Sequence, residues 1–197
     1  MPRSTDKKLV VHRAGEEAKL QGMVSEAVFI GGRSGAGKTS VGFEIHTQLS
    51  TAGVSHCLID GDFLDMAYPP PWEHNLAERN LAAMWGNYRA LGYRRLIYLN
   101  TVSVLPVAIE RLTTAMGDNP EVVAILLTCT DTTARERLGQ REIGSTLDQH
   151  LASSADMGIQ LQANAVDWAH RIPTDARSVS HIAADVIDRM NWFTTCP

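Results

Sequence analysis

A glycine-rich turn between an apolar run and a helical pattern constrains this chain more than any other feature. The turn spans Gly32–Thr39 with the letters GRSGAGKT, and it satisfies the pattern GxxxxGK[ST]. Residues 24–30 before it are mostly apolar, and Val41, Ile45 and Leu49 after it recur at helical spacing. The segment therefore predicts a buried strand, a phosphate-binding turn and a helix in direct succession. We call residues 32–39 the phosphate loop.

Each residue type in the phosphate loop has a physical task. Glycines let the backbone approach phosphate oxygens, so that successive N–H groups surround an anion at the positive end of the next helix. The Lys38 ammonium suits the outer phosphates of a nucleoside triphosphate and is assigned to catalysis, and the Thr39 hydroxyl suits Mg2+. A glycine-rich turn with a solvated lysine is the alternative. The residues expected to contact the nucleotide here are Gly32, Arg33, Ser34, Gly35, Ala36, Gly37, Lys38, Thr39 and Ser40.

Short apolar runs alternate with helical patterns from residue 24 onward. The runs are rich in Val, Ile and Leu and mostly do not alternate with polar residues, which is typical of parallel strands covered on both faces. This order predicts an α/β fold in which a parallel sheet is flanked by helices. The expected strands cover residues 24–30, 56–59, 95–100, 122–128 and 166–172.

Two later helices are predicted from the spacing of apolar residues. Each is expected to turn one apolar face toward the sheet, and Ser178 is expected to be the N-cap of the second. The inward residues would be Ala77, Leu81, Met84, Tyr88 and Leu91 in the first helix, and Val179, Ile182, Ala183, Val186 and Met190 in the second.

Composition indicates one globular domain. The chain has 197 residues, of which 44% are hydrophobic and 20% are charged, a balance typical of a folded chain. We expect a polar arm over residues 1–23 and a single domain over residues 24–197. The formal net charge of −4 gives no general attraction to nucleic acid or to an anionic membrane, so neither is expected as a partner.

The cysteines and the apolar runs indicate a compartment. Cys57, Cys129 and Cys196 cannot all pair internally and have no zinc-binding spacing. No apolar run approaches the ~18 residues of a transmembrane helix. Residues 1–21 also lack the apolar middle of a signal peptide. A reduced, cytoplasmic setting is therefore predicted, and a homodimer is left open.

The phosphate loop and the segment Leu58–Asp62 (LIDGD) together carry a resemblance to a known group. The chain resembles the small P-loop kinases, which include adenylyl-sulfate kinase, gluconate kinase, shikimate kinase and the nucleoside monophosphate kinases, and locally it is most similar to the first of these. The resemblance implies a P-loop NTPase fold with a five-stranded parallel sheet in the order 2-3-1-4-5 and a short lid near residues 137–146. It also implies ATP and Mg2+ as cofactors.

Two aspartates, Asp60 and Asp62, stand where the second strand should end, at the sheet edge where α/β folds bind ligands. A carboxylate there could accept a proton from a substrate hydroxyl or hold Mg2+. The related kinases use an aspartate in this region for one or both tasks, so we assign Asp62 to catalysis and Asp60 to Mg2+. A turn in which Asp-Gly serves only backbone geometry is the alternative.

The segment after the fourth strand is the candidate lid. Asp131 can cap a helix there, and Arg137 and Arg141 lie four residues apart on one face of it. In the resembling kinases, lid arginines close over the phosphates and stabilise charge in the transition state, so both are assigned to catalysis. An exposed helix whose arginines are neutralised by neighbouring glutamates is the alternative.

Two further segments complete this region. Ser145–Asp148 is typical of a capping box that opens a long helix, with Leu147, Leu151 and Ala155 inward. The loop after the fifth strand resembles the loop that touches adenine in these kinases, and Arg177 is its candidate nucleotide contact. An ordinary strand–helix connection is an equal alternative there.

The segment Met66–Asn75, with three consecutive prolines, departs from the adenylyl-sulfate kinase pattern, which carries a different Phe- and Arg-bearing stretch. We predict a kinase that moves the γ-phosphate of ATP to a small-molecule acceptor, with an antibiotic-modifying kinase as a variant. A nucleotide-binding regulatory ATPase is the alternative, since no Walker B motif is clear. Candidate acceptor-facing residues are Tyr68, Trp72, His74, Asn75, Arg79 and Asn80.

Overall fold

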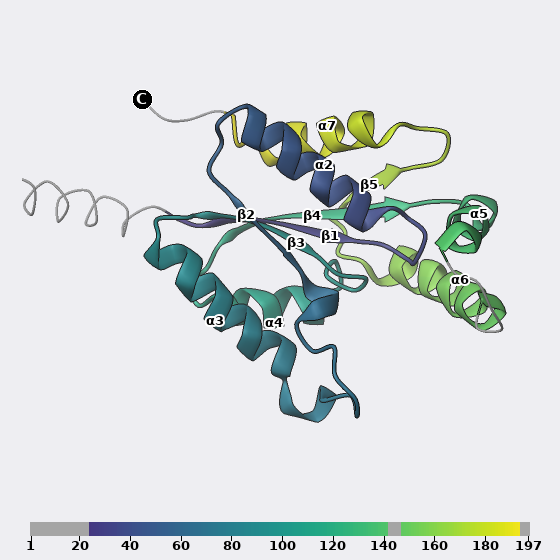
Figure 1. Ribbon diagram of the computed structural model, residues 1–197, viewed down its shortest axis with the longest axis horizontal. Coiled ribbons are helices and arrows are strands. Elements are labelled where there is room, and N and C mark those ends of the chain that lie inside the picture. Colours follow the sequence, from purple (N-terminus) through teal and green to yellow (C-terminus); the bar gives the residue numbers. More distant parts are fainter. Residues whose placement is uncertain (1–23, 142–146, 194–197) are drawn as a thin grey trace, which may run out of the picture.

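A five-stranded parallel sheet forms the centre of the molecule (Figure 1). The computed structural model describes residues 24–141 and 147–193. The strand order is β2-β3-β1-β4-β5, which confirms the predicted fold class and sheet order. The strands are β1 (Glu26–Gly31), β2 (Cys57–Asp60), β3 (Arg95–Leu99), β4 (Glu121–Thr128) and β5 (His170–Pro173).

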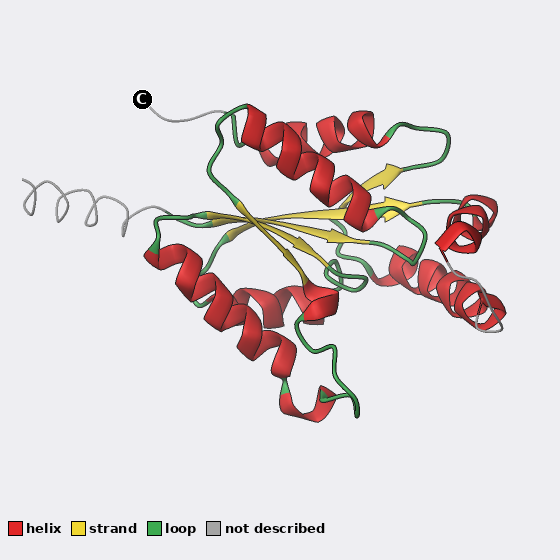
Figure 2. Cartoon of the chain, viewed as in Figure 1, coloured by secondary structure: helices red, strands yellow, loops and turns green. Residues whose placement is uncertain are grey.

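Helices cover both faces of the sheet (Figure 2). Helices α2 and α7 lie side by side on one face, α3, α4 and α6 lie on the other, and α5 stands beyond the carboxyl end of β4 (Figure 1). The helices are α2 (Lys38–Thr51), α3 (Leu76–Ala90), α4 (Pro106–Met116), α5 (Asp131–Arg141), α6 (Leu147–Asn164) and α7 (Val179–Met190), with short 3-10 turns η1 (Gly61–Phe63) and η2 (Trp72–His74).

The central strand β1 shows why the sheet is covered on both faces. Val28 and Ile30 pack in the cluster that holds α2 and α7, whereas Ala27 and Phe29 pack in the cluster that holds α3 and α4. All four side chains are buried, as the unbroken apolar run predicts. Among the described residues, no helix has the length and apolar character needed to cross a membrane.

Two sequence predictions about these elements were wrong in detail. The fifth strand begins at His170, because Val166 packs against α6 and its N–H group donates to the Val104 carbonyl. In α3, Met84 and Leu91 are exposed. The buried face is rotated toward Trp85, whose indole Nε1 donates to Asp118 Oδ2 at 3.3 Å.

The last helix follows its prediction closely. Ser178 is the N-cap of α7 and accepts a hydrogen bond from the His181 N–H group. The predicted inward residues are buried except Val179, which is 40% exposed in the first turn. The N-terminal arm, lid residues 142–146, Ser145 of the capping box and Cys196 lie outside the described residues.

Candidate active site

The phosphate loop connects β1 to α2 at the carboxyl edge of the sheet. Gly37, with φ of 97°, is the N-cap of α2, and the Lys38 Nζ donates to the Gly32 carbonyl at 2.8 Å. The Gly32 N–H group donates to the Thr101 carbonyl at 3.1 Å, which ties the loop to the segment after β3. A Cβ at Gly32 would lie 2.7 Å from the Leu127 carbonyl oxygen, so this position requires glycine. The loop thus has the backbone geometry and the cation that a polyphosphate requires.

The Arg33 side chain in the phosphate loop is buried against α5 and α6. Its side chain is 7% exposed, its Nε donates to Ser154 Oγ at 2.9 Å, and its Nη1 pairs with Asp131. Ser154 Oγ in turn donates to the Ser34 carbonyl at 2.8 Å. The Arg33 side chain therefore holds the phosphate loop against α5 and α6, and the contact of Arg33 with a nucleotide stays a prediction.

Arg137 on α5 lies against the phosphate loop. Its Nη1 donates to the Gly35 carbonyl at 3.1 Å and to Thr174 Oγ1 at 3.0 Å, and its Nη2 donates to the Thr174 carbonyl at 2.9 Å. Helix α5 runs to Arg141, as predicted, but the Arg141 side chain lies outside the described residues. In this arrangement Arg137 joins the phosphate loop to the end of β5, and its catalytic role stays a prediction.

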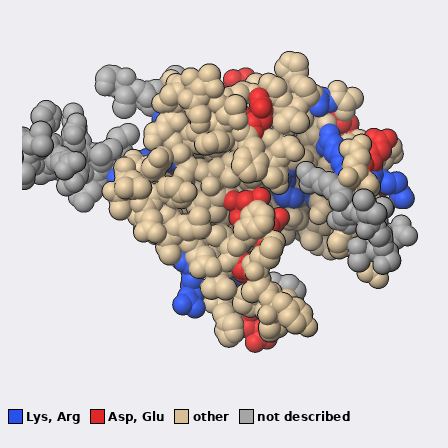
Figure 3. Space-filling view, viewed as in Figure 1, with Lys and Arg blue, Asp and Glu red and all other residues tan. Residues whose placement is uncertain are grey.

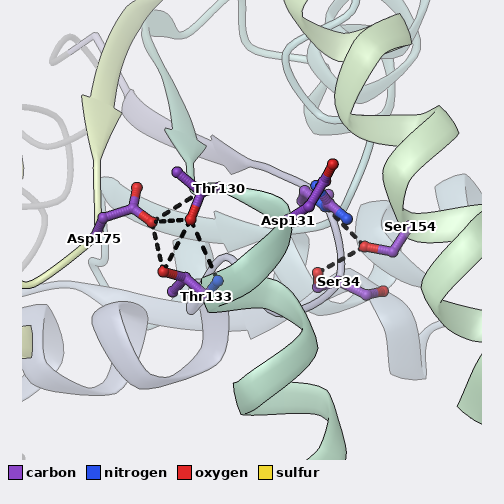
Figure 4. Close-up of polar contacts among 7 residues, drawn as sticks. Ser34, Thr130, Asp131, Thr133, Ser154 and Asp175 are labelled. Carbon is purple, nitrogen blue, oxygen red and sulfur yellow. Dashed lines mark hydrogen bonds and ion pairs between the residues drawn. The ribbon is translucent and has the colours of Figure 1, made fainter.

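Asp175 fastens the start of α5 to the loop after β5 (Figure 4). Its Oδ1 accepts hydrogen bonds from the Thr130 N–H group at 3.0 Å, Thr130 Oγ1 at 2.8 Å and Thr133 Oγ1 at 2.6 Å. These donors hold the pKa of Asp175 below its ordinary value, with the Thr133 hydroxyl making the largest contribution. Thr130 Oγ1 accepts from the Thr133 N–H group at 3.3 Å, so Thr130 takes the capping role predicted for Asp131.

Asp62 and Asn100 meet at the carboxyl ends of β2 and β3. Asn100 Nδ2 donates to Asp62 Oδ1 at 2.9 Å, and Asn100 Oδ1 accepts from the Val102 N–H group at 3.1 Å. Desolvation of the carboxylate raises the pKa of Asp62, and the Lys38 ammonium opposes this shift. Asp60 Oδ1 accepts from the Asp62 N–H group at 3.1 Å and so caps η1.

A pocket of about 310 Å³ lies beside this aspartate, between η1, the end of β3 and helices α3 and α4. Asp65, Glu78 and Arg111 line it together with Tyr98 and Asn100. Arg111 Nη1 lies 3.8 Å from Glu78 Oε1. Figure 3 shows acidic side chains gathered on the face of the molecule where η1 lies.

Comparison with known proteins shows which family the first part of the chain is similar to. A family model described as adenylylsulphate kinase matches residues 24–80, a stretch shorter than half of the chain that includes the phosphate loop and both aspartates. A search of curated proteins finds no matching sequence.

Solved structures match over most of the chain. The adenylylsulphate (APS) kinase of Mycobacterium tuberculosis in complex with AMPPNP and APS is 19% identical, covers 84% of this chain and 96% of its own, and has a TM-score of 0.52. A gluconokinase from Sinorhizobium meliloti is 16% identical, covers 84% of this chain and 91% of its own, and has a TM-score of 0.55. A tunicamycin resistance protein of Deinococcus radiodurans is 18% identical, covers 85% of this chain and 96% of its own, and has a TM-score of 0.59. The fold is that of the small P-loop kinases.

Several residues that were predicted to contact the nucleotide or the acceptor have other surroundings in the structure. Arg177 donates to Asp185 Oδ2 at 2.7 Å and to the Pro173 carbonyl at 3.3 Å, so its guanidinium packs on α7. Tyr68 is 96% exposed, and Asn80 Nδ2 donates to the Leu64 carbonyl at 2.6 Å.

Other candidates from the proline-rich segment lie away from the pocket or outside the described atoms. Asn75 and Arg79 line a separate groove of about 590 Å³ between α3 and α4. His74 is exposed, and the Trp72 side chain lies outside the described residues. Of the described candidates, none lines the pocket beside Asp62, and their contact with an acceptor stays a prediction.

The residues that sequence reasoning missed are those of the pocket and the amide that holds Asp62. Asn100 was visible as the polar residue ending the third strand, the place where a ligand-binding edge residue is expected. Glu78 and Arg111 lie on α3 and α4, and no local pattern pairs them. Asp65 also lines the pocket.

Proposed function

We propose that this chain is an ATP-dependent phosphotransferase that moves the γ-phosphate of ATP to a hydroxyl group of a small molecule. One observation carries the proposal: the phosphate loop, the Asp62–Asn100 pair and the 310 Å³ pocket lie next to one another at one sheet edge. The hydrogen bond from Gly32 N–H to the Thr101 carbonyl ties the phosphate loop to the segment after β3, where the neighbouring residues Asn100 and Val102 line the pocket. This arrangement suits in-line transfer between two bound partners.

The nucleotide side is assigned to the phosphate loop. The inward backbone N–H groups and the N-terminus of α2 would hold the phosphates, and Lys38 would neutralise charge on the outer ones. Mg2+ is commonly held by one or two protein oxygens together with phosphate oxygens. The Thr39 hydroxyl and the second oxygen of Asp60 are the donors we assign to it. Bound Mg-ATP supplies the transferable phosphoryl group and the metal charge that stabilises its transfer.

The acceptor side is assigned to Asp62. Asn100 fixes one carboxylate oxygen, so the other is oriented to accept the proton of a substrate hydroxyl. Because the pKa of Asp62 is raised above its ordinary value, the ionised carboxylate is a better proton acceptor than a fully solvated one. The Lys38 ammonium opposes that shift.

A coupled assay for ADP tests the proposal. Purified full-length chain receives Mg-ATP with and without a panel of hydroxylated small molecules. We expect at least one acceptor to stimulate ADP formation, and we expect Lys38→Ala to abolish the stimulation. Lys19→Ala makes the same chemical change in the N-terminal arm and serves as the control. ATP hydrolysis that no acceptor stimulates would contradict the proposal and favour a regulatory ATPase.

A further inference from the structure

The pocket beside Asp62 is rich in negative charge. Asp65 and Glu78 line it, and the carboxylates of Asp60 and Asp62 stand next to it on β2 and η1. Among the described residues that line the pocket, Arg111 carries the sole positive charge. That charge is already engaged, because Arg111 Nη1 lies 3.8 Å from Glu78 Oε1.

Tyr98 adds a buried polar group that points to the same space. The residue is 3% exposed and lines the pocket. Its hydroxyl lies beside Gly61, since a Cβ built there would be 2.3 Å from Tyr98 Oη. None of the hydrogen bonds between described residues uses this hydroxyl, and the hydroxyl is not among the fully enclosed atoms without a partner, so it is open to the pocket that the residue lines. A ligand in the pocket is therefore an available partner for it.

The field in the pocket acts on this hydroxyl. Burial raises the pKa of Tyr98, and Asp62, Glu78, Asp65 and Asp60 raise it further in that order. The phenol consequently stays protonated and can both donate to and accept from a neutral hydroxyl group. Four carboxylates act on this hydroxyl, and two of them, Asp65 and Glu78, belong to residues that line the pocket.

We infer that the acceptor is a hydroxylated molecule that carries no negative charge, and that a cationic amine on it improves recognition. This inference rests on the proposed function, because it names the substrate class of the same site. An anionic acceptor would enter among carboxylates of like charge, with Arg111 already paired to Glu78. An ammonium group that loses its water on entering the pocket would gain carboxylate partners there, and hydroxyl groups of the acceptor would form hydrogen bonds with Tyr98 and Asn100.

Matched acceptors that differ only in charge test the inference. The panel consists of sugar and polyol sets such as glucosamine, glucose and glucuronate, and the measurement is kcat/KM for transfer from γ-labelled ATP. We expect the amine and neutral members to exceed the carboxylate member by about tenfold or more. A carboxylate member that is preferred or equal would overturn the inference alone. A panel with no phosphorylated member would overturn both the inference and the proposed function.

Glu78→Gln provides the second arm. It removes one negative charge and leaves Arg111 without its carboxylate partner, so the preference should shift by about tenfold toward the carboxylate member. Glu110→Gln makes the same change on α4, outside the residues that line this pocket, and should leave the preference unchanged. A Glu78→Gln variant that folds with the wild-type melting temperature and keeps the wild-type preference would also overturn the inference.

Discussion

Asp62 is the side chain whose replacement separates chemistry from nucleotide binding. Asp62→Asn keeps the size of the residue and removes its charge, so no carboxylate remains at this position to accept the proton of the acceptor hydroxyl. We expect acceptor phosphorylation to fall by roughly 10²–10⁴-fold, the usual contribution of a general base. Affinity for Mg-ATP, measured by titration, should change little because the phosphate loop supplies that contact.

Asp188→Asn is the matched control for this change. It makes the same chemical change at an exposed position of α7, away from the phosphate loop and the pocket. We expect it to leave the acceptor-dependent rate unchanged. An Asp62→Asn enzyme that retains most of its acceptor-dependent rate would remove Asp62 from the mechanism.

Desolvation raises the pKa of Asp62 and the hydrogen bond from Asn100 opposes this shift, which gives a prediction about pH. The hydrogen bond from Asn100 stabilises the ionised carboxylate and lowers the pKa of Asp62, against the larger effect of desolvation. Asn100→Ala should therefore raise that pKa, so activity is lost at a higher pH as the solution is acidified. The measurement is the acid limb of kcat/KM for the acceptor. A limb that stays in place or moves to lower pH would show that Asn100 does not act through Asp62.

At the scale of elements, Arg33 couples the phosphate loop to α5 and α6. The guanidinium is buried, whereas its partner Asp131 is 74% exposed. Asp131→Ala leaves a buried cation without its anion and should lower the free energy of unfolding by about 1.5–3 kcal/mol, as for hydrogen bonds to charged groups. Glu136→Ala, on an exposed part of the same helix, should change it by less than about 0.5 kcal/mol.

Chemical denaturation of both variants measures this difference. We expect the Asp131→Ala protein to unfold at lower denaturant concentration than the Glu136→Ala protein with a similar slope. Equal midpoints would mean that the pair contributes nothing beyond an ordinary surface ion pair.

The Asp175 contact between the β5 loop and α5 makes stability depend on pH. Because the folded-state pKa of Asp175 is depressed, its contribution is present near neutral pH and is lost as the pH falls through that pKa, below the ordinary value of 3.8. Asp175→Asn should lower the melting temperature at neutral pH, and the difference from wild type should shrink at about pH 3. Thermal unfolding at both pH values checks this, and a difference that does not change with pH would contradict it.

At the scale of the whole molecule, local patterns predict the sheet and the nucleotide side of the site. The phosphate loop requires only neighbouring residues, and the order of the strands follows from the resemblance that those residues carry. The direction of Arg33 could not be read in this way, because its partners Ser154 and Asp131 lie 121 and 98 residues away. Arg33 occupies a variable position of the motif, so the motif does not determine where its side chain points.

The pocket beside Asp62 could not be predicted from local patterns for the same reason. Its polar residues come from η1, α3, β3 and α4, and only the packing of α3 against α4 brings Glu78 to Arg111. The fifth strand was predicted to begin too early, at Val166. This residue is apolar because it packs against α6, and an apolar residue just before a strand cannot be told from the strand by sequence pattern alone. Helix α4 begins at Pro106, a favoured first helical residue that the apolar spacing alone did not single out.

The central claim is that the phosphate loop and the pocket serve one reaction. The most direct measurement follows ATP labelled in its γ-phosphate, with an acceptor that stimulates turnover, and separates labelled acceptor from inorganic phosphate. We expect the label to pass to the acceptor with one ADP formed for each product molecule, and we expect Asp62→Asn to lose this transfer while still binding Mg-ATP. Release of the label only as inorganic phosphate, at a rate that no acceptor changes, would contradict it.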